Sequence, residues 1–333
     1  MSEASTHGHA RTLTDGHGPV DASVSVGAGP CPSVIHAKLV LTALFWGGTF
    51  IAGRHVSQHL GPFTIAFLRF AMASMLLLLL TRSREGRFPR LTLNQLGLVV
   101  LLGMTGVFTY NALFFKGLKL IEASRASLIV ATCPAFIATA SVLFLREKFR
   151  PLQVVGIPLS ILGAGVVISH GDLRGILAGG IGMGEFLILG CVLSWAAYSL
   201  IGKAVMHRLS PLAAVSCSSA LGAMALAVPA AMESPVKNLG HASWLDWAAI
   251  VYLAVFGTVL GFVWFYEGVR LIGATRAGLF INFVPISAVI LAALILREPI
   301  TWSLAIGAAL VLSGVFLTNR RSLPKLGPQK VPE

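Results

Sequence analysis

The side chains that could do chemistry in this chain suit the binding of a solute better than the making or breaking of bonds. Arg69 is the one charge clearly inside an apolar segment, about seven residues from its start, or roughly 10 Å along a helix axis. A charge at that depth is costly, so it must face a bundle interior or reach toward the membrane interface. Arg69 could therefore contact a solute carboxylate or form a gate, or it could bond to carbonyls and a neighbouring helix.

Two prolines lie near the middle of apolar segments. Pro134 and Pro285 each remove a helical hydrogen bond and should kink their helix. The carbonyl that each frees can meet a solute or water only where the helix lines a cavity, and otherwise the kink only shapes the bundle. Thr132 and Asn282 precede these prolines by two and three residues. Because hydrocarbon does not tolerate an unpaired amide, Asn282 is our first candidate for a solute contact, with an interhelical hydrogen bond as the alternative.

Aromatic side chains form a further group of candidates. Trp46 and Trp195 lie near the middles of corresponding apolar segments and could form the walls of a cavity. Tyr110, Asn111 and Trp264 lie near the ends of two other segments. Aromatic clusters at such ends usually form interface belts, but they could also form gates or stack on an organic solute.

Catalytic motifs are missing from the whole chain. It contains no HExxH, no GxSxG, no GxGxxG after a strand and no GxxxxGK[ST]. We therefore expect no enzyme activity, no cofactor and no catalytic or metal-binding residues, and we interpret the histidines near segment ends as interfacial. Proton coupling is left open, because Glu122, Glu185 and Glu267 lie at segment edges and no carboxylate lies at mid-membrane.

The composition excludes a soluble protein. Of the 333 residues 56% are hydrophobic and only 11% are charged, and the mean hydropathy is +0.82. Soluble domains carry roughly 25% charged residues, so this chain cannot cover a water-facing surface. The net charge of +12 does not indicate a nucleic-acid partner, because the basic residues lie at the ends of apolar segments, as in membrane orientation. The expected partners are a lipid bilayer and a small solute.

Ten apolar segments are long enough to cross a bilayer. They run over about 35–53, 63–80, 96–115, 126–145, 152–169, 185–201, 212–231, 247–266, 277–296 and 303–318. A polar, Gly-rich link near residues 170–184 divides them into two groups of five. The sequence therefore predicts an all-α integral membrane protein with ten transmembrane helices.

The two groups of five segments are copies of one another. Residues 117–147 and 268–298 align without a gap at an offset of 151 and share 12 of 31 positions. Shared positions include Pro134/Pro285 and the Arg-Glu pair that follows each segment. Because each half has an odd number of spans, the halves must run in opposite directions across the membrane. This inverted repeat is typical of secondary transporters with two near-equivalent states.

The distribution of Lys and Arg predicts the orientation. With the N-terminus inside, cytoplasmic segments hold 17 of these residues and outer loops hold 7, which favours cytoplasmic termini. The predicted organisation is a disordered cytoplasmic tail over 1–34, five-helix repeats over 35–169 and 185–319, and a second cytoplasmic tail over 320–333.

Several short motifs, in this order and duplicated, give the chain a family resemblance. They are Trp46-Gly47-Gly48-Thr49-Phe50, Pro62 through Arg69, Ala123-Ser124-Arg125-Ala126 leading to Pro134, and Arg146-Glu147, with second-half copies of the last two. Over about residues 38–320 the chain resembles the drug/metabolite transporter superfamily, in its EamA-type branch of ten-helix bacterial permeases. The resemblance implies an inverted repeat with a path lined largely by helices one, three, four, six, eight and nine.

The resemblance also implies a function. Members of this superfamily export amino acids, their metabolites or drug-like molecules from the cytoplasm, so we expect a secondary transporter in the bacterial inner membrane. An integral-membrane enzyme or lipid-handling protein is the alternative, and a non-transporting membrane scaffold is a third interpretation. The sequence does not indicate an oligomeric state.

Overall fold

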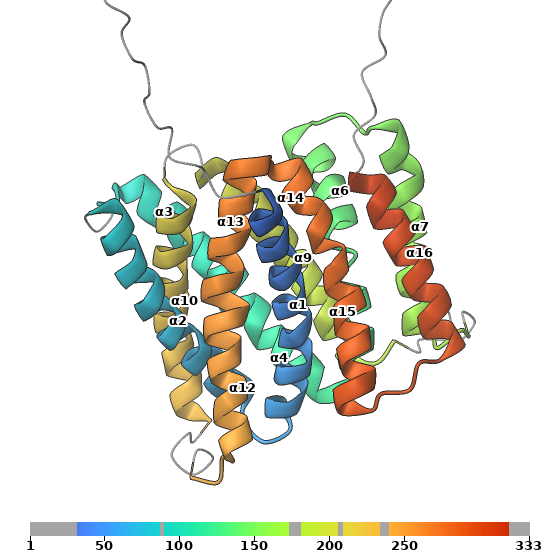
Figure 1. The fold of residues 1–333 in the computed structure, drawn as a ribbon, viewed down its shortest axis with the longest axis horizontal. Coiled ribbons are helices and arrows are strands. Elements are labelled where there is room, and N and C mark those ends of the chain that lie inside the picture. The colour runs from blue at the N-terminus through green and yellow to red at the C-terminus, as the bar shows by residue number, and fades with distance from the viewer. Residues whose placement is uncertain (1–31, 87–89, 173–180, 206–208, 234–239, 320–333) are drawn as a thin grey trace, which may run out of the picture.

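Ten long helices form a single bundle. The structure, a computed structural model, describes residues 32–86, 90–172, 181–205, 209–233 and 240–319 (Figure 1). Within these ranges, ten helices are long and apolar enough to span a membrane, which confirms the predicted all-α, ten-span architecture. The predicted tails lie outside the described residues, except that Pro32 already begins the first helix.

The first half contains five spans, two of which are built from shorter pieces. In chain order they are α1 (Pro32–Ser57); α2 (Pro62–Glu85); α3 (Leu93–Leu102), η1 (Gly103–Thr109) and α4 (Tyr110–Leu120) as one span; α5 (Ala123–Val130) and α6 (Cys133–Leu145) as one span; and α7 (Pro151–Ile168).

The second half repeats this plan. It consists of α9 (Met183–Val205); α10 (Pro211–Met232); α12 (Trp244–Ala254), η2 (Val255–Leu260) and α13 (Gly261–Ile272) as one span; α14 (Ala274–Ile281), α15 (Phe283–Leu291) and η3 (Ala292–Leu296) as one span; and α16 (Trp302–Asn319).

Local sequence signals explain where many of these helices begin. Pro62, Pro151 and Pro211 occupy the first position of α2, α7 and α10, where a missing N–H costs nothing. Thr92 and Ser243 start α3 and α12 with reciprocal capping boxes that satisfy the first free N–H groups.

The predicted kinks before the two prolines are present. α5 ends at Val130 and α6 begins at Cys133, and in the copy Asn282 separates α14 from α15. Each break precedes its proline by only a few residues, because the ring removes a donor and crowds the turn before it.

Two π-helical segments also occupy matching places, and no sequence signal indicated them. η1 and η2 interrupt the third span of each half at nearly the same point of the 151-residue offset. A π turn widens the helix and leaves carbonyls for side chains to bond. Asn111 uses such carbonyls, donating to Gly106 O at 3.3 Å and to Val107 O at 2.8 Å.

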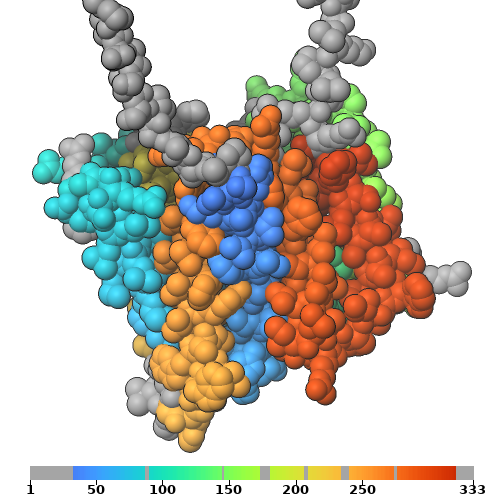
Figure 2. Space-filling model, viewed as in Figure 1, coloured from blue at the N-terminus to red at the C-terminus, as the bar shows by residue number. Residues whose placement is uncertain are grey.

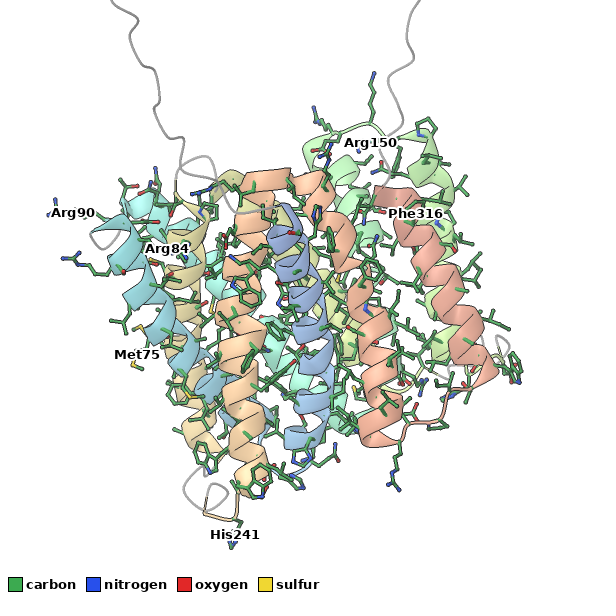
Figure 3. The ribbon with its side chains drawn as sticks, viewed as in Figure 1. Met75, Arg84, Arg90, Arg150, His241 and Phe316 are labelled. Atoms are coloured by element: carbon green, nitrogen blue, oxygen red, sulfur yellow. The ribbon has the colours of Figure 1, made fainter. Side chains whose placement is uncertain are left out.

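The bundle has two ends. We call the side on which α1 begins and α16 ends the terminus face, and the other side the opposite face (Figure 1). Arg84, Arg90 and Arg150 project from the terminus face, whereas His241 lies at the opposite face (Figure 3). Arg146 and Arg297 close the fourth span of each half, on opposite faces, with matching positive φ values of 55° and 56°.

Helices at the edge of the bundle approach one another closely through glycines. α7 and α16 pack so tightly that a Cβ on Gly163 would lie 2.6 Å from Val311 N. α1 lies between α12–α13 and α15 on the side shown in Figure 2. The bundle exterior is apolar, with Met75 and Phe316 59% and 47% exposed, as expected of a surface that faces lipid.

Candidate functional site

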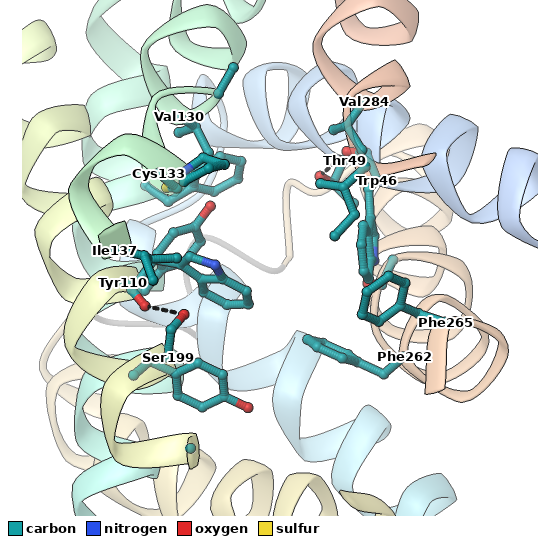
Figure 4. A pocket seen from close by; sticks show the side chains of 18 of the residues that line it. Trp46, Thr49, Tyr110, Val130, Cys133, Ile137, Ser199, Phe262, Phe265 and Val284 are labelled. Atoms are coloured by element: carbon teal, nitrogen blue, oxygen red, sulfur yellow. Dashed lines mark hydrogen bonds between the residues drawn. The ribbon is translucent and has the colours of Figure 1, made fainter. Parts of the chain in front are cut away.

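A cavity of about 430 Å³ lies between the two halves, a volume typical of small-molecule sites (Figure 4). The first half contributes residues of α1, α4, α5 and α6 and single residues of α2 and α3, and the second half contributes residues of α9, α10, α13, α15 and α16 and single residues of η2 and α14. The described wall contains aromatic residues from both halves: Trp46, Phe50, Tyr110, Phe114, Trp195, Tyr198, Phe262, Phe265 and Tyr266.

Most of the residues singled out from the sequence meet at this cavity. Seven of the ten candidates line it: Trp46, Arg69, Tyr110, Pro134, Trp195, Asn282 and Pro285. Their positions are compatible with the predicted roles, and contact with a solute remains a prediction.

The other three candidates lie elsewhere. Asn111 is buried behind Arg69, and Thr132 is fully buried with its Oγ1 donating to Ile129 O of its own helix at 2.6 Å. Trp264 packs against Phe45, with ring centroids 5.7 Å apart, on the side of α13 away from the cavity wall.

Helix periodicity explains the place of Trp264 and could have identified its better neighbours. Phe262, Phe265 and Tyr266 follow the i, i+3, i+4 spacing and share one face of α13. Trp264 falls between them and points away. The aromatic cluster was recognisable from the sequence. Which face of the helix meets the cavity depends on the rotation of α13 about its axis, and that rotation is set by packing against the neighbouring helices.

Arg69 is fixed from two sides and still reaches the cavity. Its Nε donates to Thr258 Oγ1 at 3.0 Å and its Nη1 donates to Asn111 Oδ1 at 3.1 Å, so α2 is linked to η2 and α4. The guanidinium also lies 5.1 Å from the centre of the Phe70 ring. Nη2 takes part in none of these hydrogen bonds. The interhelical tie considered from the sequence is therefore present, and the side chain lines the cavity as well.

The two tryptophans occupy related environments in the two halves. Trp46 Nε1 donates to Gly257 O at 3.1 Å and packs against Phe265, whereas Trp195 packs against Tyr110 and Tyr198. Glycines in the π segments leave space for these aromatic rings. A Cβ on Gly106 would lie 2.3 Å from the Tyr198 ring, so a larger residue there would displace the cavity wall.

The charge on the cavity wall is positive. Arg69 and Lys203 line it, and none of the described lining residues is Asp, Glu or His. Lys203 is half-exposed and donates to Ser141 Oγ at 3.1 Å, with Glu147 Oε1 at 3.3 Å. The described wall thus holds no acid–base pair for catalysis, but it offers cationic groups to an anionic part of a solute.

Asn282 lines the cavity and also makes an interhelical hydrogen bond. It lines the cavity at the break between α14 and α15, and its Oδ1 accepts a long hydrogen bond of 3.5 Å from Asn319 Nδ2. A contact at that distance is weak, so the amide could exchange it for a solute at low cost.

The cavity is closed toward the opposite face. α5 begins there, and its residues from Ala123 to Ile129 are all buried. Arg125 pairs with Glu185 at 2.8 Å, which joins α5 to α9. Toward the terminus face, by contrast, the wall includes Lys203 and Val205 at the end of α9, with the Lys203 side chain 49% exposed. The described cavity wall therefore extends to the terminus face.

The chain matches a protein-family model, and its sequence is similar to those of named transporters. Residues 35–169 and 182–320 match the model of the EamA-like transporter family. YyaM, an uncharacterized transporter of Bacillus subtilis (strain 168), is 30% identical over 86% of this chain and 93% of its own length. A probable terminal-alkyne amino-acid exporter of Streptantibioticus cattleyicolor is 28% identical over the same shares.

A solved crystal structure shows the same fold. It covers 86% of this chain and 98% of its own, with a TM-score of 0.56 at 21% sequence identity. That identity supports likeness of architecture alone.

Proposed function

Because the chain belongs to the EamA-like transporter family, which confirms the resemblance seen in the sequence, we propose that it moves a small organic solute through the central cavity by alternating access. The inverted repeat supports this mechanism, since two halves of one design can form either of two openings. The cavity, closed toward the opposite face and extending to the terminus face, corresponds to one of those two states.

We infer that the solute carries a carboxylate beside an apolar group. The observation that carries this inference is Arg69, a buried cation on an aromatic cavity wall whose described residues include no acid. A charge in such a site attracts an anion strongly, because little water screens it. Amino acids and related metabolites fit this description, and a relative named as an amino-acid exporter supports it. Drug-like carboxylates fit it equally well.

Export is the direction that we propose. The excess of Lys and Arg on segments at the terminus face supports an orientation with both termini in the cytoplasm of a bacterial inner membrane. The state described above would then load its solute from the cytoplasm.

A transport assay tests the proposal. The full chain, in everted vesicles, would be supplied with a panel of labelled amino acids and of the matching amines that lack the carboxylate. We expect transport of a subset of the carboxylates, and Arg69→Gln should reduce apparent affinity by roughly ten- to a hundredfold, the value of a charged hydrogen bond.

Matched variants separate binding from folding. Arg69→Lys retains the charge and should recover part of the affinity, and Ser218→Ala, at the matching place in the second half, should leave affinity unchanged. Membrane abundance is measured for each. Transport of no compound by a folded chain would contradict the function, whereas unchanged carboxylate transport by Arg69→Gln would contradict only the assigned solute contact.

A further inference from the structure

Three potential metal ligands converge at the opposite face, away from the cavity. His55 lies in the last turn of α1, His59 in the turn that follows, and Asp246 in the first turn of α12. Nδ1 of His59 is 2.8 Å from Oδ1 of Asp246, and Nε2 of His55 is 3.3 Å from the same oxygen. All three ligand atoms lie within 4.8 Å of one another.

The carboxylate is held in place by its own helix. Oδ2 of Asp246 accepts hydrogen bonds from Ser243 N at 2.9 Å and from Ser243 Oγ at 2.7 Å, which leaves Oδ1 directed at the two imidazoles. The Asp246 side chain is only 3% exposed. A ligating carboxylate whose second oxygen is hydrogen-bonded is the usual arrangement around a bound metal.

Hydrogen bonds among His55, His59 and Asp246 leave one imidazole nitrogen without a partner among the described residues. His59 bonds Asp246, but Nε2 of His55 is buried and makes no hydrogen bond with any residue that the structure describes, although it lies close to the same oxygen. A buried imidazole nitrogen aimed at a carboxylate and at a second imidazole is well placed to give its lone pair to a cation.

From this geometry we propose that His55, His59 and Asp246 bind a divalent transition metal, with Zn²⁺ as the best fit. Two imidazole nitrogens and one carboxylate oxygen form the kind of ligand set that Zn²⁺ accepts, whereas Mg²⁺ and Ca²⁺ prefer oxygen ligands. Zinc bonds of 2.0–2.2 Å place tetrahedral ligand atoms roughly 3.3–3.5 Å apart. The 3.3 Å between His55 Nε2 and Asp246 Oδ1 matches this spacing, whereas the 2.8 Å hydrogen bond between His59 Nδ1 and the same oxygen would be replaced by two bonds to the metal and would lengthen by about 0.5 Å.

The site has room for a further ligand and connects the two halves. The His55 and His59 side chains are 34% and 50% exposed, so water can complete the coordination. α1 belongs to the first half and α12 to the second. A bound metal therefore fastens the first span to the eighth at the face where the cavity is closed. This inference does not depend on the transport function.

Zinc binding by the full chain tests the proposal. The protein, purified without a histidine tag and treated with a chelator, would compete with a chromophoric zinc indicator near neutral pH. His55→Ala and His59→Ala should each weaken binding by roughly a hundredfold, and Ser243→Ala by about tenfold, as expected for ligands and for a supporting hydrogen bond. His36→Ala removes a histidine from the terminus face and should have no effect.

Further variants distinguish the proposed site from the histidines of the N-terminal tail and from a folding defect. His7, His9 and His17 lie outside the described residues, and their combined replacement by Ala should leave the site intact. If a histidine variant fails to fold, Asp246→Asn tests the same site while retaining an oxygen for the helix cap. Zinc should also raise the melting temperature of the native chain but not that of Asp246→Asn. Binding that is lost only with the tail histidines, or that is equal in all cluster variants, would overturn the proposal.

Discussion

The starts of α5 and α14 are copies of one sequence in two different environments. At α5, the carboxylate of Glu298 accepts hydrogen bonds from Ala123 N at 2.8 Å and Ser124 N at 2.9 Å. These N–H groups have no partner within the helix, so the carboxylate both caps it and complements its dipole. Arg125 is buried and paired with Glu185. This end of the bundle is sealed.

At α14, two residues that match buried positions of α5 are exposed. Arg276, the copy of Arg125, is exposed. Leu279 is 40% exposed, whereas its copy Leu128 is 1% exposed. Glu147, the copy of Glu298, lies beside Lys203 with about half of its side chain exposed.

The two helix starts differ in burial although they share several residues. The arginine and the glutamate are present in both copies, yet only one end is closed, so we attribute closure to how the two halves are packed together. Under alternating access, the contacts now made at α5 describe what α14 would make in the other state. The following predictions, in order of decreasing effect, test whether the sealed end depends on those contacts.

The largest effect is expected from Arg125→Ala. It leaves Glu185 buried without its cation, which typically costs about 3–5 kcal/mol. The copy, Arg276→Ala, changes an exposed side chain and should stay within about 0.5 kcal/mol. Unfolding of the purified chain in a graded denaturing detergent measures both. Equal losses in the two variants would show that the asymmetry between the two ends is not energetic.

Glu298→Ala should have the next largest effect. Loss of two charge-assisted hydrogen bonds at a helix start should cost about 1.5–3 kcal/mol. The copy, Glu147→Ala, removes a half-exposed ion pair with Lys203 worth less than about 1 kcal/mol. The same unfolding measurement applies. A cysteine placed at Ser124 should in addition react faster with a thiol reagent when Glu298 is absent, and an unchanged rate would argue against a sealing role.

The smallest effect concerns Gly53 and Gly202, which are copies in α1 and α9. A Cβ on Gly53 would lie 2.8 Å from Leu118 Cδ1, so Gly53→Ala should destabilise by about 1 kcal/mol or more. No atom of the described residues lies within 4 Å of a Cβ on Gly202, so Gly202→Ala should stabilise α9 by up to about 1 kcal/mol. Melting-temperature shifts of opposite sign in the two variants would support the difference between α1 and α9, and shifts of the same sign would contradict it.

Much of the candidate site was predictable because its signals are local. Pro134 and Pro285 break their helices through their own rings, and Trp46, Trp195 and Arg69 stand out in apolar segments wherever the helices pack. Asn111, Thr132 and Trp264 could not be placed in this way, because a polar or aromatic residue near a cavity can face the solute, its own backbone or lipid. The choice depends on the rotation of each helix against neighbours distant in the sequence.

The ten spans, the duplication and the opposite directions of the two halves could all be predicted from the amino-acid sequence, because hydropathy and an odd number of crossings per half leave no other arrangement in a bilayer. The packing of the helices sets which carboxylate meets which cation, as in Arg125 with Glu185, and it brings Asp246 to His55 and His59. It also brings the carboxylate of Glu298 to the start of α5. These pairings join residues far apart in the chain, and a repeat offers each residue two equivalent places, so only the packing of the halves selects one.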